Sequence, residues 1–306
     1  MNNIEKSIYG FIIGDACGVP FEFRERDTFK CDEMIECNCE SFHHVPLGTW
    51  SDDTSLMLCT LNAFCASQNN IKEVYKQNCI DWLYEGKYTP DGIVFDIGNA
   101  CKKMIAEYKT GVKNMDADKV TANGNGGLMK ISPISFLGIE DDEEIVYYIN
   151  LFNKESHNHY ISNYGCLIYI KLLKDMLLGS NIKDAIQNLE IKNEFKTNEY
   201  KRIYDKSILD EKRYKIKSTG YVVHTLEAAI WCTATSASFE EAVFKAVNLG
   251  DDTDTVAAIT GSFAGIQFGI PKHLLNNIRG LNIVLNEIKN FENAHLNEND
   301  NDIGER

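Results

Sequence analysis

Apolar residues recur at three- and four-residue spacing along most of this chain, and this pattern restricts the possible folds more than any other feature. Strand-like alternation is nearly absent, and so is the alternation of strands with helices that builds a doubly wound sheet. The pattern predicts an all-α fold, a compact single-domain orthogonal globule of ten or more helices without internal repeats. The segments that carry it are 3–17, 52–68, 71–85, 95–109, 160–178, 181–189, 220–237, 239–249, 254–269 and 271–289.

Two stretches fall outside this pattern. Residues 191–218 are strongly charged and predict a solvated excursion from the globule. Residues 291–306 are polar and predict a disordered tail. Residues 1–290 are therefore expected to form one domain, because a chain of 306 residues is long enough to bury a sizeable core.

Charge and cysteine usage restrict the class of protein. The formal net charge is −14, from 31 basic and 45 acidic residues, which argues against nucleic-acid or anionic-membrane binding. No apolar window is long enough to predict a membrane span. The ten cysteines are scattered and no signal peptide is evident, so a reduced, cytoplasmic protein is expected. Cys31, Cys37 and Cys39 lie close together, and a zinc site and solvent-side thiols both remain open there.

Two acidic clusters stand at the start of apolar helical segments. The stretch "GDDTDTVAAITGSFAG" (250–265) places Asp251, Asp252 and Asp254 before eleven uncharged residues. The stretch "GTWSDDTSLMLCTLNAF" (48–64) repeats the arrangement with Asp52 and Asp53. A helix N-terminus stabilises one carboxylate by about 1 kcal/mol, whereas further carboxylates repel it. Either cluster alone is explained by capping, but two of them favour bound cations.

The ligand chemistry and one glycine pattern indicate how such a site would form. Oxygen ligands without nearby histidine or cysteine suit Mg²⁺ or Mn²⁺, and two converging clusters could hold two ions roughly 3.5–4 Å apart. Ala257, Gly261 and Gly265 recur at every fourth position of one predicted helix. A glycine inside a helix costs about 1 kcal/mol, so this bare face predicts close backbone packing. Such packing would draw the acidic helix start toward the middle of the molecule.

The chain resembles the ADP-ribosylglycohydrolase family, the dinuclear-magnesium group related to the dinitrogenase reductase-activating glycohydrolase. The matching motifs occur in the family's order and cover residues 5–270. They are "GDACGVPFEF" (14–23), "GTWSDDTSLML" (48–58), "FDIGNA" (95–100), "GNGGLMKISPI" (124–134), "SHNHY" (156–160), "GYVVHTLEAAIW" (220–231) and "GDDTDTVAAITGSFAG". The resemblance implies that the fold is ADP-ribosylglycohydrolase-like and that 1–290 is the catalytic domain.

The resemblance also implies two Mg²⁺ ions, for which Mn²⁺ can substitute, and a set of residues around them. The implied metal ligands are Ser51, Asp52, Asp53, Asp252, Asp254 and Thr255, with Glu22 at or near one metal. Asp251 has no role that can be transferred. The implied catalytic residues are Asp53, Asp96 and Glu22, and Asp96 would lie beside the ribose. A solvent-facing position of Glu22 remains an alternative.

Substrate-binding residues follow from the same motifs. Gly124, Asn125 and Gly126 match the loop along the ribose and diphosphate, although a simple turn would explain them too. His157 and His159 would lie on the diphosphate side. Gly220 and Tyr221 would lie toward the adenosine. Capping or core-edge roles are the alternative for the two histidines. Lys130 stands where relatives often carry arginine.

The implied function is hydrolysis of the N- or O-glycosidic bond between ADP-ribose and an acceptor, an ADP-ribosylated protein side chain. Departure of the acceptor from the anomeric carbon of the ribose builds oxocarbenium-like charge on the sugar. Metals together with carboxylates can activate the attacking water. Hydrolysis of a free ADP-ribose derivative and a non-catalytic ADP-ribose-binding relative are the alternatives. All four metal aspartates are present, which favours catalysis. The linkage, the target protein and the oligomeric state remain open.

Overall fold

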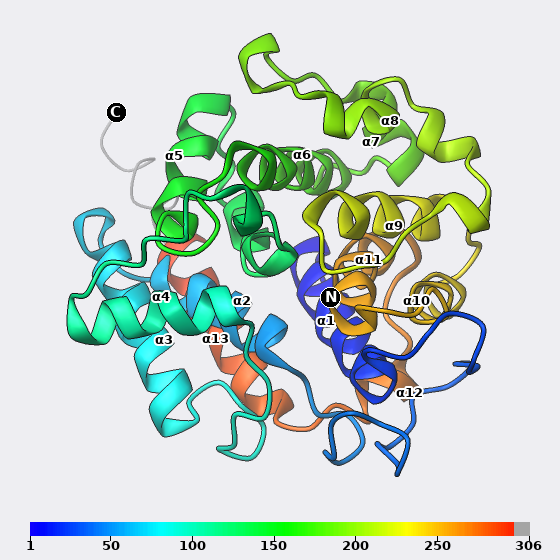
Figure 1. Cartoon of the computed structure of the whole chain (residues 1–306), viewed down its shortest axis with the longest axis horizontal. Helices are drawn as coiled ribbons and strands as arrows, with labels where there is room; N and C mark the ends of the chain where they lie inside the picture. The colour runs from blue at the N-terminus through cyan, green and yellow to red at the C-terminus, as the bar shows by residue number, and fades with distance from the viewer. Residues whose placement is uncertain (297–306) are drawn as a thin grey trace.

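Helices account for the regular structure of the part of the chain that the computed structural model describes, residues 1–296 (Figure 1). No β-strand occurs within this range, where an isolated antiparallel bridge joins Gly124 and Tyr221. The all-α prediction is therefore confirmed. The α-helices are α1 (Asn3–Gly18), α2 (Asp52–Ala63), α3 (Ile71–Glu85), α4 (Asn99–Thr110), α5 (Asp142–Asn153), α6 (Tyr160–Leu177), α7 (Ile182–Asn188), α8 (Lys201–Tyr204), α9 (Val222–Ala234), α10 (Phe239–Val247), α11 (Thr253–Phe268), α12 (Lys272–Leu275) and α13 (Leu281–Leu296).

Short 3₁₀ turns link several of these helices. They are η1 (Val19–Phe21), η2 (Gln68–Asn70), η3 (Val120–Ala122), η4 (Asn125–Gly127), η5 (Ser132–Leu137), η6 (Asn193–Phe195), η7 (Asn198–Tyr200), η8 (Ser207–Asp210) and η9 (Arg213–Lys215). Of the described helices, none combines the length and the apolar character needed to cross a bilayer.

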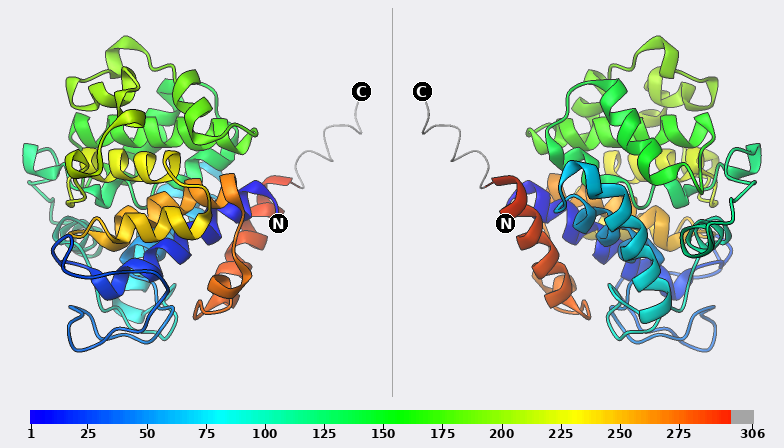
Figure 2. Two further views of the ribbon diagram at one scale, coloured as in Figure 1. Left: turned by 90° about the vertical axis from the view of Figure 1, so that its right-hand side faces the viewer. Right: turned by 90° about the vertical axis from the view of Figure 1, so that its left-hand side faces the viewer.

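Helices α1 and α11 lie side by side at the centre of the molecule, although more than two hundred residues separate them in the chain (Figures 1 and 2). A Cβ atom added to Gly10 would stand 2.0 Å from the carbonyl oxygen of Gly261, and one added to Gly261 would stand 2.0 Å from that of Gly10. One on Gly14 would lie 2.0 Å from the oxygen of Ala257. The two backbones are thus in direct contact, as the glycine spacing predicts.

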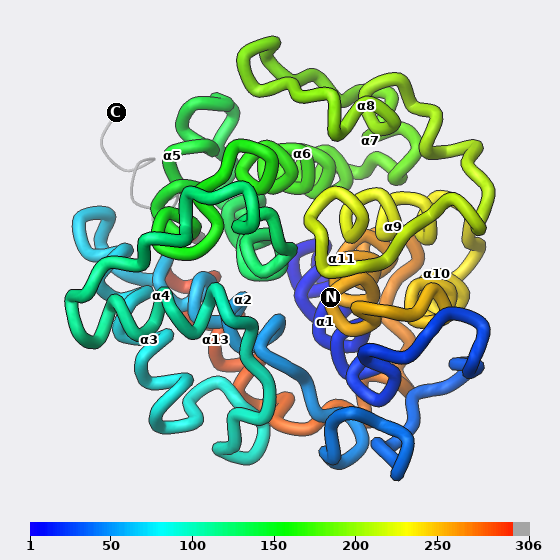
Figure 3. Tube along the Cα trace, viewed as in Figure 1, coloured from blue at the N-terminus to red at the C-terminus, as the bar shows by residue number. Residues whose placement is uncertain are grey.

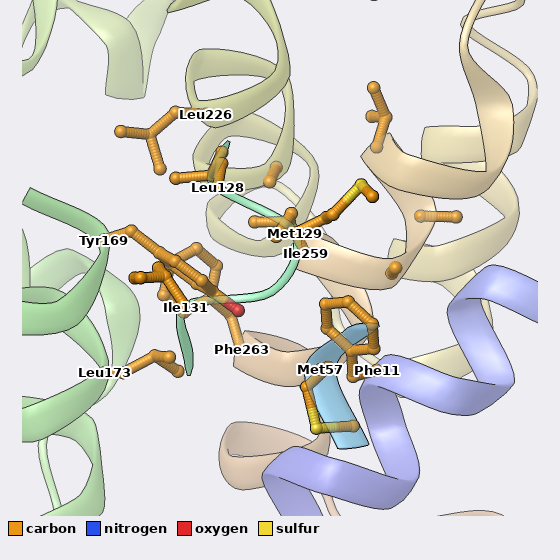
Figure 4. Close-up of a cluster of buried hydrophobic side chains, with 14 of the residues drawn as sticks. Phe11, Met57, Leu128, Met129, Ile131, Tyr169, Leu173, Leu226, Ile259 and Phe263 are labelled. Atoms are coloured by element: carbon orange, nitrogen blue, oxygen red, sulfur yellow. The ribbon is translucent and has the colours of Figure 1, made fainter. Parts of the chain in front are cut away.

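The core fills the space around this helix pair. Figure 4 shows Phe11 of α1, Met57 of α2, Tyr169 of α6, Leu226 of α9 and Phe263 of α11 converging on one cluster. These side chains are buried to 1 % exposure or less, so water is excluded from the core around the helix pair. The path of the chain through these elements can be followed in Figure 3.

The structure differs from the sequence-based expectation in two central segments. Helix α5 lies outside the ten predicted segments, although Asp141 caps it by accepting a hydrogen bond from the backbone N–H of Glu144 (3.2 Å). The stretch 191–218 is not simply solvated, because it packs Ile203, Ile208 and Ile216 into the core from short helical turns.

The helix boundaries near the C-terminal end differ as well. The segment 271–289 is divided into α12 and α13 near Gly280, whose φ is +64°. Helix α13 continues to Leu296, so the first six residues of the expected polar tail (291–306) are helical. The remaining ten lie outside the described residues.

Candidate metal centre and active site

The two acidic helix starts meet inside the protein. Ser51 is the N-cap residue of α2, and its hydroxyl accepts a hydrogen bond from the backbone N–H of Asp53 (3.2 Å). Thr255, in the first turn of α11, places its Oγ1 3.3 Å from Oδ1 of Asp53. Asp252 occupies the N-cap position of α11 but makes no capping hydrogen bond. Capping therefore explains Ser51, whereas it does not explain Asp252.

Asp15 of α1 adds a third carboxylate to this cluster. One oxygen each from Asp15, Asp53 and Asp254 lie within 4.8 Å of one another. Asp15 is fully buried and accepts hydrogen bonds from the backbone N–H groups of Ser51 (2.9 Å) and Thr54 (3.1 Å), so it ties α1 to the start of α2. Burial raises its pKa to about 6. Asp15 was not predicted from the sequence.

Glu22, His43 and Asp96 form a second group whose ligand atoms also lie within 4.8 Å of one another. Glu22 is 6 % exposed, which excludes the solvent-facing alternative, and its Oε2 lies 2.5 Å from Nε2 of His43. Burial, with the nearby charges of Asp96 and Asp252, raises the pKa of Glu22 to about 7 against the opposing effect of His43. Burial lowers the pKa of His43, but Glu22 outweighs it and the net shift is upward. His43 was not predicted from the sequence.

A cavity of about 380 Å³ opens above both groups. Among its described lining residues there is no lysine or arginine. The predicted site residues that line it are Glu22, Asp52, Asp96, Gly124, Asn125, Gly126, His157, Asp252, Asp254 and Thr255. Segments far apart in the sequence thus contribute to a single acidic cavity.

The electrostatics of this cavity fit a divalent cation. Burial, reinforced by neighbouring carboxylates, raises the pKa of Asp52, Asp53 and Asp254 well above the usual range. Oδ2 of Asp53 and Oδ1 of Asp252 are buried and have no hydrogen-bond partner within the described residues. Buried oxygens of this kind are costly unless a cation or donor satisfies them. The donor set of carboxylates and hydroxyls is the one that Mg²⁺ and Mn²⁺ prefer.

The glycine loop forms another wall of the cavity. Asn125 donates from its side chain to Oδ2 of Asp252 (3.0 Å) and from its backbone to the carbonyl of Gly220 (2.9 Å). A Cβ on Gly126 would stand 2.9 Å from Cε1 of His157, so the loop needs glycine there. Burial, with the charge of Lys130, lowers the pKa of His157 well below its usual range and keeps the imidazole neutral.

Other predicted residues lie beside the cavity rather than in its lining. His159 caps α6, with Nδ1 accepting a hydrogen bond from the backbone N–H of Ile161 (3.4 Å). Gly220 and Tyr221 flank the glycine loop, where the bridge to Gly124 holds them. The roles of these three residues toward a substrate stay predictions.

The cysteines take no part in the two groups. All ten thiols are free, and Cys31 is buried whereas Cys39 is exposed. Within residues 1–296, the gathered ligand groups contain only carboxylates and one histidine. The alternative of a zinc site at Cys31, Cys37 and Cys39 therefore finds no support in the described structure.

Comparisons with known proteins agree with this geometry. The model of the ADP-ribosylglycohydrolase family matches residues 1–301. The chain is 28 % identical over 287 residues to ADP-ribosylarginine hydrolase Tri1 of Serratia proteamaculans, a match covering 91 % of this chain and 75 % of the relative. It is 22 % identical over 265 residues to the ADP-ribosyl-[dinitrogen reductase] glycohydrolase of Rhodospirillum rubrum, covering 85 % and 84 %.

A solved structure shares the fold. It is titled an ADP-ribosylglycohydrolase-related protein complex, and it matches with a TM-score of 0.72 and 23 % identity over 96 % of this chain and 95 % of that one. The family match spans both acidic helix starts and the glycine loop. The chain belongs to the ADP-ribosylglycohydrolase family and is a hydrolase of glycosidic bonds.

Proposed function

We propose that this enzyme is a Mg²⁺-dependent hydrolase that releases ADP-ribose from arginine side chains of ADP-ribosylated proteins. The observation that carries the proposal is the meeting of carboxylates from four distant segments in and beneath one cavity without a lysine or arginine in its described lining. The name of the Serratia proteamaculans relative, an ADP-ribosylarginine hydrolase, supports the arginine linkage. The dinitrogen reductase glycohydrolase supports a protein substrate.

The metal ligands that we propose lie at the starts of α2 and α11. Two ions would be held by Ser51, Asp52, Asp53, Asp252, Asp254 and Thr255, whose arrangement is tied together by the contact of Thr255 with Asp53. Magnesium bound there would supply Lewis-acid polarisation of the ribose hydroxyls and of a water molecule. Mn²⁺ would substitute because it accepts the same oxygen donors.

Glu22 is proposed to transfer the proton, and Asp96 is proposed to contact the ribose. The Glu22 carboxyl, whose pKa burial raises to about 7 in the metal-free protein, is proposed to accept or donate the proton of the reaction. The backbone N–H of Gly98 donates to Oδ2 of Asp52 (3.1 Å), which fixes the loop that carries Asp96. Ligand atoms of Asp96 and Glu22 lie within 4.8 Å of each other, and we expect Asp96 to contact a ribose bound in the cavity.

The glycine loop is proposed to take the ribose and diphosphate. Gly124 and Gly126 present backbone without side chains to the cavity, which leaves room for the substrate. The neutral ring of His157 lines the same wall. This imidazole can hydrogen-bond a phosphate oxygen without adding a buried charge.

Release of ADP-ribose from arginine-linked ADP-ribosylated protein tests the proposal. With Mg²⁺ or Mn²⁺ the purified protein should release ADP-ribose, and a chelator should stop the release. No release with either metal would contradict the proposal. Turnover only of a small ADP-ribose derivative, or binding of ADP-ribose without turnover, would establish one of the two alternative functions instead.

A further inference from the structure

Two exposed phenylalanines stand at the mouth of the acidic cavity. Phe23 lines the cavity and is 59 % exposed, and Phe42 is 66 % exposed. Their ring centroids are 4.9 Å apart in an edge-to-face arrangement. Adjacent exposed aromatic side chains beside a cavity are typical of a recognition surface, whereas single ones are unremarkable. We refer to Phe23 and Phe42 as the aromatic pair.

The backbone at Phe23 shows that core packing does not explain this ring. Its φ is +64°, in the left-handed region that is unfavourable for a bulky residue. Two hydrogen bonds hold it there: Phe23 N–H donates to the oxygen of Asp251 (2.7 Å), and Asp251 N–H donates to that of Arg24 (2.9 Å). Glycine would adopt this conformation without strain. The chain nevertheless carries phenylalanine, with its ring at the cavity and exposed.

The aromatic surface continues from the pair down to the carboxylates. The ring of His43 packs edge-to-face on Phe42 and on Phe95, at 5.0 Å from each. The same His43 ring contacts Glu22 through Nε2. A group resting on Phe23 therefore has aromatic faces on one side and the carboxylates of Glu22 and Asp96 within the same cavity.

This combination suits a guanidinium group. A guanidinium is planar, weakly hydrated and permanently charged, so it stacks on aromatic faces and pairs with carboxylates at the same time. A neutral hydroxyl or amide leaving group gains little from either contact. The glycine loop and His157 line the same cavity, where the ADP-ribose portion is proposed to bind.

We propose that the aromatic pair is the acceptor subsite and binds the guanidinium of the ADP-ribosylated arginine through its ring faces. The proposal rests on the function proposed above and assigns arginine specificity to two residues outside the metal centre. Phe23 would make the direct contact, and Phe42 would hold the Phe23 ring in its orientation.

Steady-state kinetics on an ADP-ribosylarginine peptide, together with calorimetric binding of ADP-ribose, test the assignment. Phe23→Gly should lower kcat/KM about tenfold, mainly through KM, within the range expected for a partly desolvated cation–π contact. Its affinity for ADP-ribose, which lacks the guanidinium, should stay within about twofold. Phe23→Tyr should retain wild-type kinetics. Tyr147→Ala, an aromatic of 57 % exposure on α5, is the matched control and should change neither quantity.

The melting temperature separates recognition from a structural role. Phe23→Gly relieves the left-handed strain and removes little buried surface, so it should melt at or above the wild-type temperature. Unchanged kcat/KM in Phe23→Gly, or an equal loss of ADP-ribose affinity, would overturn the assignment. If the wild-type protein releases no ADP-ribose from the arginine-linked peptide, the proposed function itself fails. Wild-type release is measured before any variant, so the two failures are distinguishable.

Discussion

Removing the carboxylate of Asp254 should have opposite effects on the metal-free and the metal-bound protein. Oxygens of Asp15, Asp53 and Asp254 lie within 4.8 Å of one another. Two unit charges at that distance repel by about 3 kcal/mol at an effective dielectric constant of 20. Protonation relieves part of this repulsion, because burial raises the pKa of all three carboxyls. Asp254→Asn should therefore stabilise the metal-free protein by about 1–3 kcal/mol.

Bound Mg²⁺ should reverse the order of the two melting temperatures. A cation present at a hundredfold excess over its dissociation constant stabilises the folded state by about 2.7 kcal/mol. Asp254→Asn loses a proposed ligand and most of that gain, and it should lose nearly all hydrolysis. In scanning calorimetry, the variant should melt a few degrees above wild type in chelator and below wild type in Mg²⁺, at about 2–4 °C per kcal/mol.

Asp251→Asn is the matched control. Asp251 is exposed, lies outside both ligand groups and adopts a φ of +61°, which asparagine tolerates. The Asp251→Asn variant should melt like wild type with and without Mg²⁺. Its activity should stay within about tenfold of wild type, because only shifts of about 1 Å in the catalytic groups lower the rate about a hundredfold. If Asp254→Asn melts below wild type in chelator, or if both variants respond equally to Mg²⁺, the charge-repulsion argument is refuted.

The remaining predictions concern turnover, packing and pH. Asp96→Asn should cut turnover while calorimetric Mg²⁺ affinity stays near wild type; joint loss of both would make Asp96 a metal ligand. Gly261→Ala should lower the free energy of unfolding by about 1–3 kcal/mol or more, because the new Cβ would overlap the Gly10 carbonyl. Gly98→Ala is the control and should not lower it, because no atom lies within 4 Å of a Cβ at that position. The pKa of Glu22 is raised to about 7 on folding, so metal-free protein should lose stability as pH rises from about 4.5 to about 7. Glu22→Gln should flatten that loss in pH-dependent melting, and an unchanged slope would count against it.

The acidic helix starts are predictable from the sequence because their signal is local. Asp52 and Asp252 each stand among polar residues directly before a long uncharged run. Their meeting is not local, and only the glycine spacing around Gly261 hints at it. That spacing predicts a close partner helix but does not identify α1, whose Gly10 and Gly14 supply the facing surface.

The missed members of the site carry no local signal. Asp15 lies within an apolar helical pattern, and its hydrogen-bond partners Ser51 and Thr54 follow 36 and 39 residues later. His43 belongs to a stretch without periodicity, and its partner Glu22 comes 21 residues before it. Such pairings depend on how loops fold over the finished core, which spacing rules do not describe.

The two differences in the central segments have different origins. Helix α5 had a readable start, since Asp141 precedes three acidic residues in the first turn. The stretch 191–218 buries single residues such as Ile203 and Ile208 from separate short turns rather than one face of a long helix. Hydrophobic periodicity detects the apolar face of a long helix, so it does not detect a segment that buries single residues from short turns.

The glycine contact between α1 and α11 also dictates the order in which the protein can assemble during synthesis. Residues 3–18 emerge from the ribosome before the surface that they pack against, which consists of residues 253–268. Until that segment has been translated, α1 lacks its partner and Asp15 lacks Asp254 beside it. The acidic cluster can therefore form only after residue 268 has been translated, a consequence of very non-local pairing.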